Sequence, residues 1–184
     1  MKRILKDYGR YILIFVFFLV IYEFLGFLNL YGDPLANYGF SYAISRGEVP
    51  YRDFNTIATP FYAFLMAIGL IFFNNYLIFV IEQCILVTIM FYFLFKLYGA
   101  KSYLLLFVIC LFRFLGINST YNFMALFFLV YLLYLEKNKS SNDIFIGVII
   151  GLTFLSKHTI GTLLVLPSII FYFKDKRKLF KRLV

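Results

Sequence analysis

The chain has 184 residues, of which 63% are hydrophobic and 23% aromatic, and its formal net charge is +9. Soluble domains are roughly 45–50% apolar, so this composition and the mean hydropathy of +0.88 exclude a soluble globular domain. The basic residues flank apolar runs, as the positive-inside rule requires, and do not form a nucleic-acid-binding patch. We therefore expect an all-α integral membrane protein, one membrane domain over residues 1–184, with membrane lipid as a partner and no nucleic acid.

The first apolar run covers residues 11–30, about the 20 residues that a spanning helix needs. Its basic flank, Lys2 to Arg10, predicts a cytoplasmic N-terminus. The run has no small-residue cleavage site, so we expect it to be retained. The residues that follow should then lie on the outer face.

An outer loop is expected over residues 31–75, because this stretch holds the longest polar interruption of the chain. Asp33 followed by Pro34 has the form of a helix start, an apolar stripe follows at helical spacing, and Gly47 ends the pattern. We predict an amphipathic surface helix over 34–46. Glu48 to Phe54 should be extended, since the residue before Pro50 is disfavoured in a helix.

The apolar segment 60–73 is short for a span. If it does not cross, all Lys and Arg residues face the cytoplasm except Arg46, Arg52, Arg113 and Lys157; if it crosses, the later basic groups move outside. The positive-inside rule therefore predicts a non-spanning segment, either re-entrant or juxtamembrane.

The remaining spans are predicted at 76–98, 102–117, 121–135, 143–156 and 159–173. This gives about six transmembrane helices with both termini cytoplasmic, and the high Phe, Tyr, Ile and Lys content without Trp suggests a bacterial plasma membrane. Gly147 and Gly151 form a small-residue pair that predicts a close helix approach at the fifth span.

Three ionisable residues inside spans are predicted near one depth. Glu23, Glu82 and Arg113 should lie roughly 10, 9 and 6 Å below the outer surface. Because charge in hydrocarbon is costly, they should face one another or a wet cavity. A structural Glu–Arg pairing and a functional layer both remain open.

The short outer turn of FLSKHTIG carries Lys157 and His158. A cation there could bind a phosphate at the membrane surface, or it could snorkel without a ligand. His158 is the only histidine, and no serine or cysteine nucleophile motif accompanies it, so we do not expect a His-based triad. Cys84 and Cys110 lie in apolar runs and are expected to be buried thiols, not metal ligands.

Three segments together show a resemblance to a known family. In order, they read GDPLANYGFSYAISRGEVPYRDF, TPFYAFLMAIG and GVIIGLTFLSKHTIGTLLVLP. Over residues 8–173 the chain resembles the N-terminal portion of the C-type (GT-C) membrane glycosyltransferase superfold. The nearest kin are bacterial glycosyltransferase family 39-like proteins, related to protein mannosyltransferases and lipid A aminoarabinose transferases.

The resemblance implies an inverting transfer of a sugar from a polyprenyl-phosphate donor to an unidentified cell-envelope acceptor. It implies that Asp33 is the catalytic base, that Arg52 and Asp53 position substrate or loop, and that Lys157, with His158 beside it, lies near the lipid phosphate. Arg113 could assist Lys157. The family often has two adjacent acidic residues where this chain has Asp33-Pro34, so we expect no metal, and no cofactor beyond the donor.

Members of the superfold usually have more spans, whereas this chain ends just after the basic run 174–182. We therefore expect either a truncated copy or a partner chain that supplies the C-terminal part. The alternative is a non-catalytic membrane subunit or a lipid-linked saccharide transport component. A generic structural membrane protein is a third reading.

Overall fold

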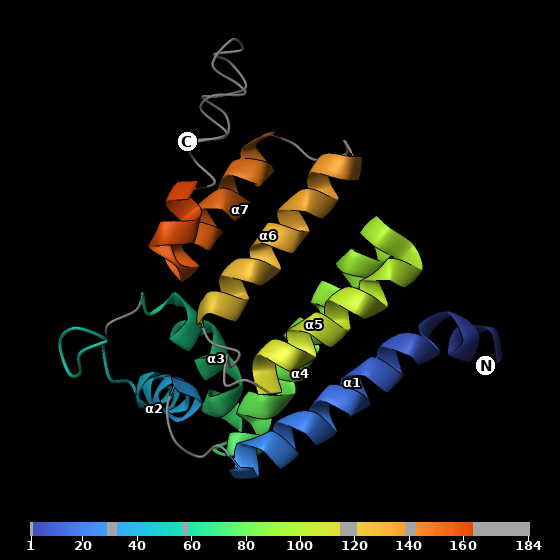
Figure 1. Ribbon diagram of the computed structural model, residues 1–184. Helices are drawn as coiled ribbons and strands as arrows, with labels where there is room; N and C mark the ends of the chain where they lie inside the picture. Colours follow the sequence, from blue (N-terminus) through green and yellow to red (C-terminus); the bar gives the residue numbers. More distant parts are fainter. Residues whose placement is uncertain (1, 29–32, 57–58, 115–120, 139–142, 164–184) are drawn as a thin grey trace.

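The computed structural model describes residues 2–28, 33–56, 59–114, 121–138 and 143–163, and side chains over a narrower set of them. The elements are α1 (Lys2–Leu28), α2 (Asp33–Ser45), α3 (Phe61–Phe72), α4 (Tyr76–Tyr98), the 3₁₀ turn η1 (Gly99–Lys101), α5 (Ser102–Phe114), α6 (Tyr121–Asn138) and α7 (Asp143–Ser156). Residues 158–163 are also helical. Apart from an isolated bridge between Pro50 and Phe54, these ranges contain no strand pairing, so the predicted all-α class is confirmed (Figure 1).

Helix α4 is the centre of the bundle and packs against α1, α3, α5 and α6. A helix that is apolar on all sides is suited to such a buried position. Phe79, Cys84, Val87 and Phe91 on α4 are fully buried. Asn75 begins the helix by accepting a hydrogen bond from the Leu77 N–H at 3.0 Å, an N-cap that satisfies one terminal donor.

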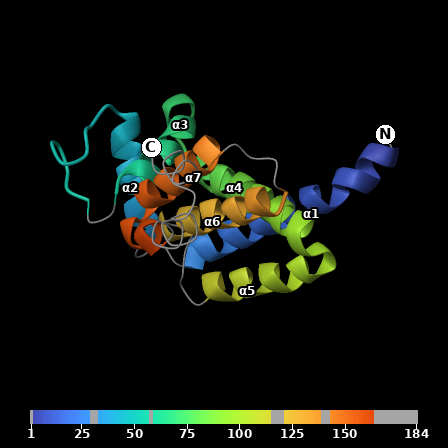
Figure 2. The same ribbon diagram turned by 90° about the horizontal axis from the view of Figure 1, so that it is seen from above.

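The chain reverses direction after α4. Gly99 has φ +59°, a left-handed conformation that glycine adopts without a steric penalty. The Ser102 hydroxyl donates to the Gly99 carbonyl at 2.7 Å, and α5 then runs back along α4 (Figure 2). Among the described residues, one helical run, Tyr76–Val108, is long and apolar enough to cross a membrane. Because this run includes the reversal, α4 with its 23 residues is the part that could cross in one pass.

Basic residues from three helices, Arg10 on α1, Lys96 on α4 and Lys137 on α6, lie at one end of the bundle, which we call the basic end. The Arg10 guanidinium lies 4.4 Å from the ring centroid of Phe95 near the end of α4. Lys137, near the end of α6, donates to the Leu97 carbonyl at 2.5 Å. A cation at that position satisfies a terminal carbonyl and opposes the negative end of the α4 dipole.

Helices α2 and α3 pack against each other at the opposite end, beside the starts of α4 and α6 (Figure 1). Tyr38 on α2 contacts Tyr76 and Phe79 edge-to-face at the start of α4. The Thr59 hydroxyl donates to the Ser156 carbonyl at the end of α7, at 2.9 Å. This end therefore gathers the region predicted as the outer loop and the turn that carries Lys157.

The helices coincide closely with the predicted ranges. A helix fills 33–45 where 34–46 was predicted, and another fills 61–72 inside 60–73. The ranges of α4 and α7 equal two predicted spans, whereas α6 continues three residues past 135. Most of the predicted span 159–173 lies outside the described residues, and the six crossings stay a prediction.

The predicted close approach at the fifth span is wrong for Gly151, where an added Cβ would meet nothing within 4 Å. Close approaches occur instead at Gly161, where an added Cβ would overlap the backbone of Phe154 on α7, and at Gly69 on α3. There, an added Cβ would lie 2.5 Å from Glu82 Oε1 and 2.6 Å from Ile78 Cγ2, both on α4. A spacing of small residues does not reveal which face of a helix meets a neighbour.

Candidate functional site

A cavity of about 270 Å³ lies between α2, the following loop and the starts of α3 and α6. Among the described residues, its lining combines aromatic rings with amides and hydroxyls and contains no charged side chain. The lining residues are Ala36, Asn37, Phe40, Phe54, Asn55, Thr56, Thr59, Pro60, Ala63 and Tyr121.

The loop after α2 folds back to form one wall of this cavity. Gly47 has φ +90°, so the chain can turn sharply where α2 ends. The Tyr51 N–H donates to the Phe54 carbonyl at 2.8 Å. Phe54 then stacks on Phe40 of α2, with ring centroids 5.5 Å apart and an interplanar angle of 10°. This stacking fixes the loop against the helix.

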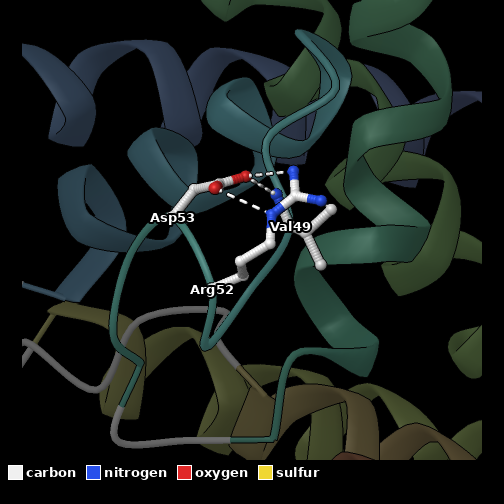
Figure 3. Close-up of polar contacts among 3 residues, drawn as sticks. All are labelled: Val49, Arg52 and Asp53. Atoms are coloured by element: carbon white, nitrogen blue, oxygen red, sulfur yellow. Dashed lines mark hydrogen bonds and ion pairs between the residues drawn. The ribbon is translucent and has the colours of Figure 1, made fainter.

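Arg52 and Asp53 brace the loop and do not line the cavity (Figure 3). Arg52 donates from Nε and Nη2 to the two carboxylate oxygens of Asp53 at 2.9 and 2.7 Å. The Val49 N–H donates to Asp53 Oδ2 at 2.7 Å. The Arg52 hydrogen bond, followed by that of Val49, lowers the pKa of Asp53 to about 2. Arg52 and Asp53 were predicted to position either the substrate or the loop, and these contacts fit positioning of the loop.

Lys157 does not line the cavity itself but lies beside the lining residue Tyr121. It is the one non-helical residue between α7 and the helical residues 158–163. Its Nζ donates to Asn122 Oδ1 at 2.5 Å and lies 5.8 Å from the ring centroid of Tyr121, which lines the cavity. Two successive residues of α6 thus hold a cation beside a cavity formed mainly by residues 36–63.

Of the other predicted site residues, Asp33, Arg113 and His158, the structure describes the side chain of His158 alone. Asp33 is the first residue of α2, one helical turn before the buried Asn37. Its side chain and that of Arg113, near the end of α5, lie outside the described side chains. His158 is exposed and does not line the cavity.

Glu82 has a described partner on α3. Its Oε1 accepts a hydrogen bond from the Gly69 N–H at 2.8 Å. Its Oε2 is buried and has no partner among the described residues. The side chains of Glu23 and Arg113 lie outside the described side chains. Of the three ionisable residues predicted to lie near one depth, the structure therefore describes the side chain of Glu82 alone. Glu82 joins α3 to α4 through a backbone group that a sequence pattern does not specify.

Several residues of this site were not predicted, namely Asn37, Asn55, Thr59, Tyr121 and Asn122. Asn37 carried a weak signal, as a polar residue within the surface helix. Asn122 is the second residue of the predicted span 121–135, and only the tertiary contact with Lys157 reveals its role. In the part of the chain that the structure describes, no group of three His, Cys, Asp or Glu side chains could hold a metal ion.

The chain matches no protein-family model, no curated protein and no solved structure.

Proposed function

We propose that the chain is a polytopic membrane protein of the C-type glycosyltransferase kind, which transfers a sugar from a polyprenyl phosphate to a cell-envelope acceptor on the outer face. One observation carries the proposal. Residues of α2 and of the loop after it line one cavity at the end of the bundle opposite the basic end, and Lys157, more than a hundred residues further along the chain, lies beside the lining residue Tyr121.

Exposed apolar side chains support the membrane assignment. Leu13 and Val20 on α1 and Leu104 and Phe107 on α5 are each more than half exposed. Large exposed apolar surfaces are suited to contact with lipid. The positive-inside rule then assigns the basic end to the cytoplasm and the cavity to the outer face.

The geometry of α3 supports a non-spanning segment. Its 12 residues reach only about 18 Å, less than the hydrocarbon core of about 30 Å. Both of its ends also lie beside α2. At its first end, Pro60 lines the cavity together with Asn37 of α2. Beyond its other end, Asn74 hydrogen-bonds to Tyr42 of α2. The pKa of the Tyr42 hydroxyl is lowered first by its hydrogen bond to Arg46 and then by this one to Asn74.

The reaction proposed for this cavity is a displacement at the anomeric carbon of the donor sugar. The acceptor hydroxyl oxygen attacks the anomeric carbon of the donor, and the bond from that carbon to the phosphate oxygen breaks. The hydroxyl proton passes to the carboxylate of Asp33, acting as the general base. The electron pair leaves with the polyprenyl phosphate, whose charge Lys157 stabilises, with Arg113 as a further cation. The amides and hydroxyls of the lining are suited to neutral sugar hydroxyls.

The test is sugar transfer by the purified chain in lipid vesicles, using undecaprenyl phosphates that carry radiolabelled glucose, mannose or aminoarabinose. Asp33→Asn should lower transfer about 10²–10⁴-fold, the usual contribution of a general base. Lys157→Gln should lower it about 10²–10³-fold through lost charge stabilisation. Lys96→Gln, at the basic end, is the matched control and should leave transfer unchanged.

Full transfer by Asp33→Asn would remove Asp33 from the mechanism. If the wild-type chain binds donor but turns over none, and Lys157→Gln abolishes binding, the non-catalytic subunit or transport component is the better account.

A further inference from the structure

A second hollow, the apolar groove, has no lining residue in common with the cavity of the candidate site. It is formed by α4, α5 and α6 and has a volume of about 580 Å³. Its walls are almost entirely aliphatic. They include Leu94, Leu105, Val108, Leu126, Val130 and Leu133.

One end of the apolar groove is charged. Among the described residues, Lys101, in the turn between α4 and α5, is the only charged lining residue, and Tyr98 also lines this end. From Lys101 to Val108 the groove follows α5 for about 10 Å. That is less than one leaflet, half of a hydrocarbon core of about 30 Å. The groove therefore has a polar mouth at the basic end and an apolar interior at the depth of lipid tails.

A second lysine lies near this mouth. Lys137 is one helical turn beyond the lining residue Leu133, so both are on one face of α6. Its Nζ donates to the carbonyl of Leu97, the residue before Tyr98. An ammonium group has three N–H donors, and one of those of Lys137 donates to a carbonyl among the described residues, so the group can also donate to a phosphate. Cations from two different elements thus flank one end of an apolar channel.

We propose that the apolar groove binds an anionic membrane phospholipid, with an acyl chain along α5 and α6 and its phosphate between Lys101 and Lys137. A peptide would bring backbone N–H and C=O groups against aliphatic walls that cannot satisfy them, whereas an acyl chain has none. The proposal rests on the membrane embedding proposed above. It is independent of Asp33 and of sugar transfer, so a failed transfer assay would not affect it.

Native mass spectrometry of the full chain in detergent tests the charge preference, with phosphatidylglycerol and phosphatidylcholine of identical acyl chains as probes. Each lysine near a lipid phosphate contributes about a fivefold preference for the anionic lipid. Wild type should therefore retain phosphatidylglycerol preferentially, and Lys101→Gln should lower that preference about fivefold. Lys96→Gln is the matched control, because Lys96 lies over the ring of Tyr92 and does not line the groove. Equal retention of both lipids by wild type, or equal losses in the two variants, would overturn the proposal.

A second variant tests the acyl-chain part. Leu105→Trp adds bulk to the wall of the apolar groove and should reduce phosphatidylglycerol retention, whereas Val20→Trp, at an exposed position on α1, should not. Undiminished binding to Leu105→Trp would show that the groove does not hold the lipid.

Discussion

Arg52 and Asp53 show how two exposed side chains can shape a loop that forms one wall of a cavity. The Asp53 carboxylate accepts hydrogen bonds from both Arg52 and the Val49 N–H. Tyr51, which lies between Val49 and Arg52 in the sequence, adopts φ +66°. A non-glycine residue in this conformation is uncommon and persists where surrounding contacts favour it. The ion pair therefore acts on the cavity through Phe54, which it helps to hold against Phe40.

The ionisation of Asp53 gives a prediction at this scale. Its pKa lies at about 2 in the folded loop against an ordinary value of 3.8. A lowered pKa means that the charged carboxylate stabilises the loop above about pH 4 and that this contribution is lost as the pH falls through about 2. The Val49 amide resonance of isotope-labelled protein in detergent micelles should therefore titrate near pH 2.

Arg52→Gln should move that midpoint upward, and Asp53→Asn should abolish it. A midpoint near 4 in the wild-type protein would show that the carboxylate is not held by Arg52 and Val49.

At the scale of elements, the contact between α3 and α4 determines where α2 and the cavity lie. Gly69 lets α3 approach α4 so closely that Glu82 reaches a backbone N–H. Gln83 donates to the Tyr62 hydroxyl at 3.2 Å and adds a buried polar contact between the same helices. Because α2 packs on α3, this contact determines where α2 sits on the bundle.

Gly69→Ala tests this contact. The added Cβ would overlap Glu82 Oε1 and Ile78 Cγ2, and overpacking of this kind costs about 1–3 kcal/mol. The temperature of unfolding in detergent should fall. Gly39→Ala, on α2 where an added Cβ meets nothing within 4 Å, should instead raise stability by about 0.5–1 kcal/mol through helix propensity. Equal effects of the two substitutions would contradict the tight approach.

The helix positions were predictable because the signals are local. Asp33-Pro34, Gly47, Pro60 and Asn74-Asn75 separate apolar runs, and helices begin or end close to each of them. The pairing of the helices was not predictable, since runs that are apolar on every side do not reveal which face meets a neighbour. Thus Glu82 bonds to Gly69, a contact that no spacing indicated.

The candidate site was predictable only in part, for the same reason. Charge counting brought Lys157 to the same side as the α2 loop. The residues that hold it, Tyr121 and Asn122, are found only in the folded bundle. Arg52 and Asp53 were singled out for their charge, but their charges are directed at each other.

For the whole molecule, we propose that α2, α3 and Lys157 lie on the outer face of the membrane and that the basic end faces the cytoplasm. The decisive measurement is the labelling of single cysteines in intact spheroplasts with a membrane-impermeant thiol reagent. Cys84 and Cys110 are first replaced by Ala. The probe positions are all exposed: Glu48, Asn74 and His158 near the cavity, and Ala100 and Asn138 at the basic end.

The account predicts that Glu48→Cys, Asn74→Cys and His158→Cys are labelled in intact spheroplasts. It predicts that Ala100→Cys and Asn138→Cys are labelled only after lysis. If Glu48→Cys were labelled while His158→Cys required lysis, Lys157 and the α2 loop would lie on opposite faces, and the proposed site would be contradicted.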